Sequence, residues 1–390
     1  MKKEIGKALC EHLPSAKWVA ISPGRVNLLG GHVDYNHGLV LPAAIDRYVQ
    51  VGFSARADRR VKIYSIDLDA AVQFSIADIG ARVDLRGAPL PHWAQYIAAV
   101  AWSLLQEGFL PAGMDAVIRS NLPIGAGLSS SAAVELAFAA AWQKLGDFKI
   151  PRMRLAQVCQ RAENAYVGVQ CGLMDQFAVA HGVARHALAF DTRSLSWQPI
   201  PLPLNTAIVI ADSAVERELS NSAYNQRRQE CRDGLSAAKI VFPQVQSLRD
   251  LDPQDLPELQ GNMPAHVFKR VHHVVEEIAR VEQGCRCLIN DHAVSFGRLM
   301  NASHASLRDL FEVSTPALDR LVAVARSLPG VFGARLTGAG FGGCTVNLVE
   351  SAHAERVAQG IHARFQQQTG IDVKVHICKP SRGVHVEAIK

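Results

Sequence analysis

The chain has 390 residues, of which 48% are hydrophobic and 20% charged, and its formal net charge at pH 7 is +5. This composition excludes a largely disordered chain, and the length exceeds one ordinary hydrophobic core, so we expect two domains that share a cleft. The small net charge and the isolated basic doublets at 59–60 and 227–228 do not support nucleic-acid binding.

The first half of the chain predicts a sheet followed by helices. Apolar and polar residues alternate in short runs, which predicts strands with one wet face, at residues 18–21, 39–45, 48–55, 61–66 and 71–76. Helical spacing of apolar residues follows over 93–105, then a strand at 115–119. Residues 131–142 are apolar all round, which is typical of a buried helix, and Pro151 begins a further helix whose inner face includes Tyr166.

The second half predicts helices on another sheet. Strands are expected at 187–190 and 207–210, and the proline-rich segment 198–204 is the most linker-like in the chain. Further elements follow: helices at 215–239, 265–288, 291–311, 316–328 and 352–369, and strands at 334–336, 345–349 and 373–378. We therefore expect an α+β fold with a boundary near residue 200, which gives an N-terminal domain at 1–200 and a C-terminal domain at 201–390.

The location of the protein is inferred from what the chain lacks. Its N-terminal region has no apolar run of signal-peptide length, and no later stretch could span a bilayer, so we expect a cytoplasmic protein with no membrane partner. The 8 cysteines have neither paired metal-ligand spacing nor the density of a secreted disulfide framework. We expect them to be reduced thiols.

A loop rich in glycine and serine, Gly125-Ala-Gly-Leu-Ser-Ser-Ser131, joins a predicted strand to the buried helix. Glycine lets backbone amides approach an anion, and the helix N-terminus and the hydroxyls add to the attraction. We interpret the loop as a phosphate site; a helix cap is the alternative. The missing Walker lysine excludes an ordinary P-loop ATPase. The candidate ATP-binding residues are Gly125, Gly127, Ser129, Ser130 and Ser131, with Gly340 from a second glycine-rich loop.

A second glycine-rich loop, Gly338-Ala-Gly-Phe-Gly-Gly343, has the spacing of a dinucleotide-binding fingerprint. A strand rather than a helix is predicted after it, so no helix N-terminus awaits a pyrophosphate. We interpret this loop, with Gly340 at its centre, as a tight connection that approaches another backbone. A plain hairpin is the alternative.

Three charged residues are candidates for phosphoryl-transfer chemistry. Glu163 lies at the edge of an apolar helical stripe, where a carboxylate needs a partner such as Mg²⁺; an exposed helix-edge glutamate is the alternative. Asp175 lies in an apolar segment and can accept or orient a hydroxyl proton; its alternative is a helix N-cap or a solvated turn. Arg25 supplies a fixed cation for charge on a transferring phosphoryl group. This set suffices for phosphoryl transfer, which depends mainly on positioning and charge.

Polar side chains at close spacing follow Arg25 in the first loop. His32, Asp34, Tyr35 and Asn36 offer the donors and acceptors that a polyhydroxylated ligand requires. Turn chemistry is the alternative, because Asp, Asn and Gly occupy turns in any case.

These segments together resemble the galactokinase family, within the superfamily that also holds homoserine, mevalonate and phosphomevalonate kinases. The resemblance is carried, in the family's order, by residues 24–36, 123–133, 171–177, 222–228, 303–308 and 336–344. It implies a two-domain α+β GHMP-kinase-like fold with the active site in the interdomain cleft. It also implies ATP-dependent phosphorylation of the anomeric C1 hydroxyl of galactose, with Mg²⁺, by a protein that we expect to be a monomer.

The resemblance also implies a role for each matching position. Asp175 matches the catalytic base and Arg25 its cationic partner. The matches to sugar contacts are His32, Asp34, Gly172 and Tyr224; those to triphosphate contacts are Ser129, Ser130 and Ser131; those to the magnesium site are Ser131 and Glu163.

One position departs from the family pattern. Galactokinases have a glutamate, which contacts the C6 hydroxyl of the sugar, where this chain has Gly31. We expect galactose to remain a substrate with relaxed selectivity at C6. The alternatives are a kinase for L-arabinose or galacturonate, or a non-catalytic sugar sensor. The intact Asp175, Arg25 and serine loop argue against the sensor.

Overall fold

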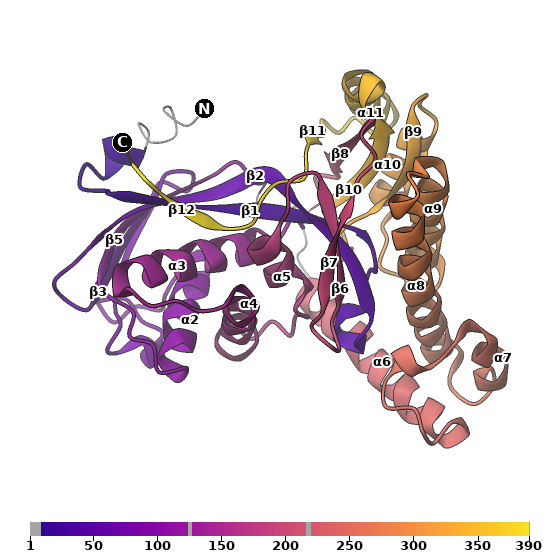
Figure 1. Cartoon of the computed structure of the whole chain (residues 1–390), viewed down its shortest axis with the longest axis horizontal. Helices are drawn as coiled ribbons and strands as arrows, with labels where there is room; N and C mark the ends of the chain where they lie inside the picture. The colour runs from indigo at the N-terminus through magenta and orange to yellow at the C-terminus, as the bar shows by residue number, and fades with distance from the viewer. Residues whose placement is uncertain (1–8, 124–126, 216–219, 390) are drawn as a thin grey trace.

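The computed structural model describes residues 9–123, 127–215 and 220–389. Within these ranges the chain has an α+β fold in which helices pack on two sheets (Figure 1). The larger, eight-stranded sheet runs in the order β12-β1-β2-β5-β3-β4, with β6 pairing to β2 and β7 to β6. Its strands are β1 (Trp18–Leu29), β2 (Leu39–Ala55), β3 (Arg60–Ser65), β4 (Ala70–Ser75), β5 (Met114–Ser120), β6 (His186–Asp191), β7 (Trp197–Pro201) and β12 (His385–Ala388).

Helices cover one face of the larger sheet (Figure 1). They are α2 (His92–Gln106), α3 (Ser130–Gly146), α4 (Arg152–Arg161) and α5 (Met174–His181), and α4 continues into a π-helical turn at Ala162–Val167. The helix α3 packs against β1 and β2 and is buried along most of its length, as its apolar sequence predicts. Its N-terminus lies at the serine-rich loop.

The smaller sheet has the order β11-β8-β10-β9. Its strands are β8 (Thr206–Asp212), β9 (Val331–Leu336), β10 (Cys344–Glu350) and β11 (Val375–Cys378). The helices of this half are α6 (Ser220–Val241), α7 (Leu256–Leu259), α8 (Ala265–Ile289), α9 (Ala293–Asp309), α10 (Pro316–Arg326) and α11 (Ala354–Thr369). Short 3₁₀ turns occur at Asp34–Asn36, Ile79–Ala81, Leu248–Asp250, Pro253–Asp255 and Ser351–His353. In Figure 1, α6 and α7 project at the end opposite the smaller sheet.

The interpretation of residues 198–204 as a linker is wrong for most of the segment. Residues Trp197–Pro201 form β7, which pairs with β6. Because β7 pairs with β6 alone among the described strands, its two prolines occupy an edge, where a missing backbone donor is tolerated.

Other elements differ in extent from the sequence prediction. The two predicted runs at 39–45 and 48–55 form one 17-residue strand, β2, with an irregular register opposite Pro23 and Gly24. A bulge of this kind lets a long strand bend without ending. The pattern also misses α5 and β12. Both are short and gain their stability from packing and pairing with β1.

No helix within the described ranges combines the length and apolar character needed to cross a bilayer. The cysteines are free thiols. Those that are buried are Cys159, Cys231, Cys285, Cys344 and Cys378.

Candidate active site

Two adjoining cavities lie against the larger sheet and its helices, with volumes of about 530 and 230 Å³. The larger extends from the N-terminus of α3 towards β3, β5 and α2, and the smaller is lined by the first loop, the 163–175 region and α6. The residues that line both are Arg25, Tyr96, Ser131, Asp175 and Ala339. Ligands bound in the two cavities would therefore meet at this shared wall.

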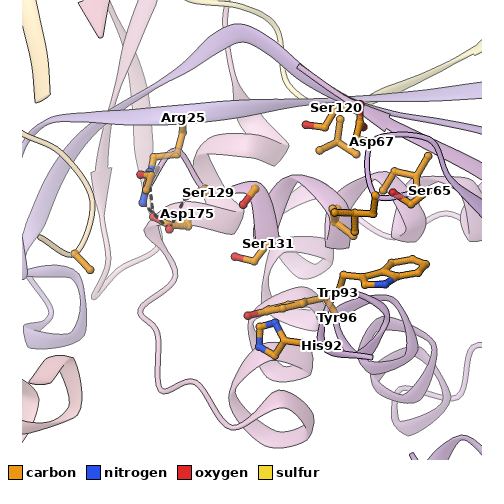
Figure 2. Close-up of a pocket in the computed structure, with 17 residues that line it drawn as sticks. Arg25, Ser65, Asp67, His92, Trp93, Tyr96, Ser120, Ser129, Ser131 and Asp175 are labelled. Atoms are coloured by element: carbon orange, nitrogen blue, oxygen red, sulfur yellow. Dashed lines mark hydrogen bonds and ion pairs between the residues drawn. The ribbon is translucent and has the colours of Figure 1, made fainter. Parts of the chain in front are cut away.

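An arginine–aspartate pair lies where the cavities meet (Figure 2). Arg25, on β1, donates from Nε to Asp175 Oδ1 at 2.8 Å and from Nη2 to Oδ2 at 2.6 Å. Its Nη1 donates to the carbonyl of Gly127 at 2.7 Å. Arg25 is buried, whereas the Asp175 side chain is 28% exposed. The fork geometry fixes the carboxylate while leaving it accessible from the cavity.

Ser129 connects this pair to the serine-rich loop. It takes a left-handed backbone conformation, with φ at 59°, immediately before α3. Its hydroxyl donates to Asp175 Oδ2 at 2.6 Å and makes no capping bond with the described residues of the helix. The first amides of α3 are therefore left for another acceptor, and Ser130 and Ser131 line the larger cavity beside them. The side chain of Ser129 therefore does not cap α3, as the alternative interpretation of the loop requires.

The two glycine-rich loops lie against each other. A Cβ added at Gly338, whose φ is 81°, would come within 2.8 Å of the Gly127 carbonyl oxygen. This close approach of two backbones was expected for the second loop. Gly340 is not among the described residues that line either cavity; a Cβ there would lie 2.3 Å from the Val313 carbonyl oxygen. Gly125, which the sequence predicts to contact a phosphate group, lies outside the described residues.

Glu163 is buried in the π-helical turn after α4, with 6% exposure, so the alternative of an exposed helix-edge glutamate is wrong. It lines the smaller cavity together with Ser131, which hydrogen-bonds to it. Burial first, and then the charge of Asp175, raise the pKa of Glu163 to about 7. A carboxylate and a hydroxyl are oxygen donors of the kind that Mg²⁺ takes, and a cation would offset the unfavourable negative charge. These residues fit a magnesium site.

The remaining predicted sugar contacts line the smaller cavity: His32, Asp34, Gly172 and Tyr224. A Cβ at Gly172 would lie 1.8 Å from Asp34 Oδ2, so only glycine leaves room for this carboxylate. Burial, and then the charge of Asp175, raise the pKa of Asp34 to about 6. Asp34 is therefore ionised at neutral pH and can accept hydrogen bonds from hydroxyl groups.

His32 is held in one orientation and one protonation state. Its Nε2 lies 3.0 Å from the Ala339 carbonyl, which can only accept, so Nε2 carries the proton and Nδ1 accepts from the Tyr35 hydroxyl at 2.9 Å. Burial lowers the pKa of His32 to about 3, which keeps the ring neutral. The His32 ring also packs against Tyr224.

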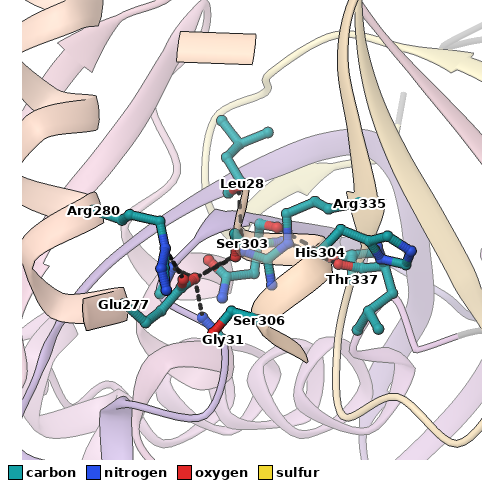
Figure 3. A network of polar contacts seen from close by, with 12 residues as sticks. Leu28, Gly31, Glu277, Arg280, Ser303, His304, Ser306, Arg335 and Thr337 are labelled. Carbon is teal, nitrogen blue, oxygen red and sulfur yellow. Dashed lines mark hydrogen bonds and ion pairs between the residues drawn. The ribbon is translucent and has the colours of Figure 1, made fainter. Parts of the chain in front are cut away.

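Gly31 also lines the smaller cavity, and behind it lies a buried ionic network (Figure 3). Glu277 Oε1 accepts from the backbone amides of Gly30 and Gly31 at 2.9 and 3.1 Å and from Arg335 Nη1 at 3.2 Å. Burial alone would raise the pKa of Glu277, but the charges of Arg280 and Arg335 lower it to about 2. A Cβ at Gly31 would lie 2.7 Å from Arg335 Nη2. The guanidinium thus fills the space that a side chain at position 31 would need.

Sequence reasoning missed several residues of the site. Glu135 is fully buried in α3 and Gln176 in α5, and neither was identified. A carboxylate in a helix that is otherwise apolar all round is a signal of the same kind that drew attention to Glu163. Other residues of the larger cavity were also missed: Tyr96 on the shared wall, and Ser65, Asp67, His92, Trp93 and Ser120 away from it (Figure 2). They come from β3, the turn after it, α2 and β5, and no local motif joins them.

Comparison with known proteins places these features in context. Residues 95–183 match the GHMP kinase N-terminal domain, residues 286–367 the GHMP kinase C-terminal domain, and residues 10–55 the galactokinase galactose-binding signature. A galactokinase from Roseiflexus sp. (strain RS-1) is 44% identical over 93% of this chain and 91% of its own length. One from Chloroflexus aurantiacus is 40% identical over 94% and 92%. The crystal structure of Lactococcus lactis galactokinase complexed with galactose superposes with a TM-score of 0.90 at 30% identity, covering 98% of each chain.

Proposed function

The chain belongs to the galactokinase family, and from that premise we propose that it transfers the terminal phosphoryl group of ATP to the anomeric C1 hydroxyl of galactose. One observation carries the proposal more than any other. Two cavities of unequal size meet at a carboxylate, Asp175, that is held by a buried arginine. A reaction between two bound substrates needs such a junction, because the reacting atoms must be held in contact.

In this proposal, galactose occupies the smaller cavity. Its hydroxyls are matched by the ionised Asp34, the neutral His32 and Tyr224. ATP occupies the larger cavity with its phosphates at Ser129, Ser130, Ser131 and Gly127, where the first amides of α3 and its dipole favour an anion. The adenine base then extends past Tyr96 towards the far end, where Trp93 offers an aromatic face. Gly340, and the Gly125 position, would shape the loops around the phosphates.

Asp175 orients the C1 hydroxyl and takes its proton as the oxygen–phosphorus bond forms and the bond to ADP breaks. Arg25 holds Asp175 by two bonds and places a fixed positive charge beside the transferring group. Ser131 and Glu163 would hold Mg²⁺, which supplies neutralisation of phosphate charge when bound. Ser129 donates a further hydrogen bond to the Asp175 carboxylate.

The relatives compared do not favour the alternative functions. They are galactokinases at 38–44% identity. Neither a change of sugar to L-arabinose or galacturonate nor a silent sensor is needed to explain the site. At Gly31, which lines the smaller cavity, Arg335 packs close to the position that a Cβ would occupy.

We further propose a boundary near residue 200, because β7 ends at Pro201 in the larger sheet and β8 begins at Thr206 in the smaller. The strand β12 returns from the C-terminal half to pair with β1, and this ties the two parts together. We also propose that the chain acts as a monomer. Free thiols and the use of ATP favour the cytoplasm.

A coupled assay of ADP release tests the proposal, with ³¹P NMR to identify the product. The sugars are galactose, L-arabinose, galacturonate and N-acetylgalactosamine. Galactose should give the fastest release and a sugar 1-phosphate. Asp175→Asn should remove the galactose-dependent rate while ADP binding persists. A folded wild-type protein that binds galactose but releases no ADP would refute the kinase and favour a sensor.

A further inference from the structure

A fully buried amide links two carboxylates beside the site. Gln176 Nε2 donates to Glu163 Oε2 at 2.7 Å and to Glu135 Oε2 at 3.1 Å. All three side chains are at least nine-tenths buried, and they come from α5, the turn after α4, and α3. An amide nitrogen has two hydrogens, and both are committed to carboxylates here.

The position of Gln176 gives this contact a geometric consequence. It follows Asp175 directly on α5, so the residue that holds Glu163 is covalently next to the residue that faces the cavity junction. On α3, Ser131 and Glu135 are four residues apart and share one face of the helix. Ser131 contacts Glu163 and Glu135 contacts Gln176. The amide therefore closes a ring of contacts that fixes Glu163 relative to both α3 and α5.

Burying these polar groups costs free energy, which indicates that they do more than fill the core. Burial, and then the charge of Glu163, raise the pKa of Glu135 well above its usual range. Glu135 Oε1 and Gln176 Oε1 are buried and have no hydrogen-bond partner among the described residues. Apolar side chains would fill the same space without leaving polar atoms unpaired. Stability alone does not account for three buried polar groups in the core.

We propose that Gln176 is a positioning residue that holds the Glu163 carboxylate in register with Asp175, and that Glu135 anchors its amide. The inference rests on the proposed function, in which Glu163 and Ser131 hold Mg²⁺. Loss of the amide frees Glu163 to take other rotamers. Residues that orient a metal ligand typically change metal affinity or activity by about 10- to 100-fold when they are replaced.

The test measures Mg²⁺-dependent binding of ADP, without turnover, through the change in tryptophan fluorescence, to which Trp93 in the larger cavity contributes. Gln176→Met, which has a similar length but no donors, should raise the Mg²⁺ concentration at half-saturation about tenfold. Glu135→Met should raise it by a smaller factor, and Glu135→Gln, which keeps an acceptor for the amide, by less again. Galactose binding should stay near the wild-type value in all three, which separates a displaced Glu163 from a disordered pocket.

Asn347→Leu is the matched control. This amide is also fully buried, on β10, and donates to the Val209 carbonyl at 2.9 Å. It should lower the Tm and leave the Mg²⁺ half-saturation unchanged. If Gln176→Met behaves like this control, the inference is overturned. If Gln176→Met does not fold, Glu135→Met carries the same test, and a wild-type Mg²⁺ response in that variant overturns it.

Glu163→Gln separates this inference from the function on which it depends. An increase in Mg²⁺ half-saturation for Glu163→Gln but not for Gln176→Met would overturn only the positioning role. An unchanged response in Glu163→Gln would remove the proposed metal site, and the positioning role with it.

Discussion

Arg25→Lys is expected to lower kcat by about 10- to 150-fold with the fold intact. Arg25 donates to Asp175 at 2.8 and 2.6 Å. A lysine keeps the charge but is a point donor on a flexible stem, so at least one of these bonds is lost. A hydrogen bond to a charged group contributes about 1.5–3 kcal/mol. At about 1.4 kcal/mol for each factor of ten in rate, this loss corresponds to the stated range.

The assay is galactose-dependent ADP release at saturating galactose and ATP, with Tm measured in parallel. Arg249→Lys is the matched control, because Arg249 makes a similar two-point pair with Asp191, at 2.5 and 2.8 Å, and lines neither cavity. It should leave kcat unchanged. A wild-type kcat for folded Arg25→Lys, or an equal loss in both variants, would refute the role of Arg25 at the junction.

Three further predictions follow from the site and its supporting network. Gly172→Ala should raise the KM for galactose about tenfold or more, because the new Cβ displaces Asp34, a charged hydrogen-bond acceptor; an unchanged KM would contradict this. The pKa of Asp34 is about 6, so galactose affinity measured by calorimetry should fall as the pH drops through 6, and this dependence should vanish in Asp34→Asn. Glu277→Gln should lower the free energy of unfolding by about 3–5 kcal/mol, because it leaves buried guanidinium groups without their carboxylate. Because the folded pKa of Glu277 is about 2, below its ordinary 4.5, the wild-type contribution is present above pH 4.5 and is lost as the pH falls towards 2. Urea denaturation across this window should show that loss in the wild type and not in the variant.

The sequence predicts which residues form the site better than it predicts the contacts that hold them in place. The sequence segments around Arg25, Ser129 and Asp175 are short and contain glycine and polar residues, so their chemistry can be predicted locally. Arg25 and Asp175 are separated by 150 positions, however, and no local pattern predicts the bidentate contact between them. Their meeting depends on how α5 packs against β1 and β2.

The residues that were missed show where local patterns stop being informative. Glu135 lies in a helix whose apolar character predicts burial correctly, and only its buried neighbours reveal why a carboxylate is tolerated there. The strand β7 was interpreted as a linker because proline generally disfavours β-strands. At the edge of a sheet proline is tolerated, and β7 lies at such an edge. The Arg335 contact at Gly31 likewise depends on the distant strand β9.

The most direct test of the central claim is a crystal structure of the chain with galactose, a non-hydrolysable ATP analogue and Mg²⁺. Galactose should lie in the smaller cavity with its C1 hydroxyl within hydrogen-bonding distance of Asp175, and the terminal phosphate of the analogue should face the same oxygen from the larger cavity. Galactose bound with another hydroxyl at Asp175, or with Asp175 remote from both ligands, would contradict the proposed function.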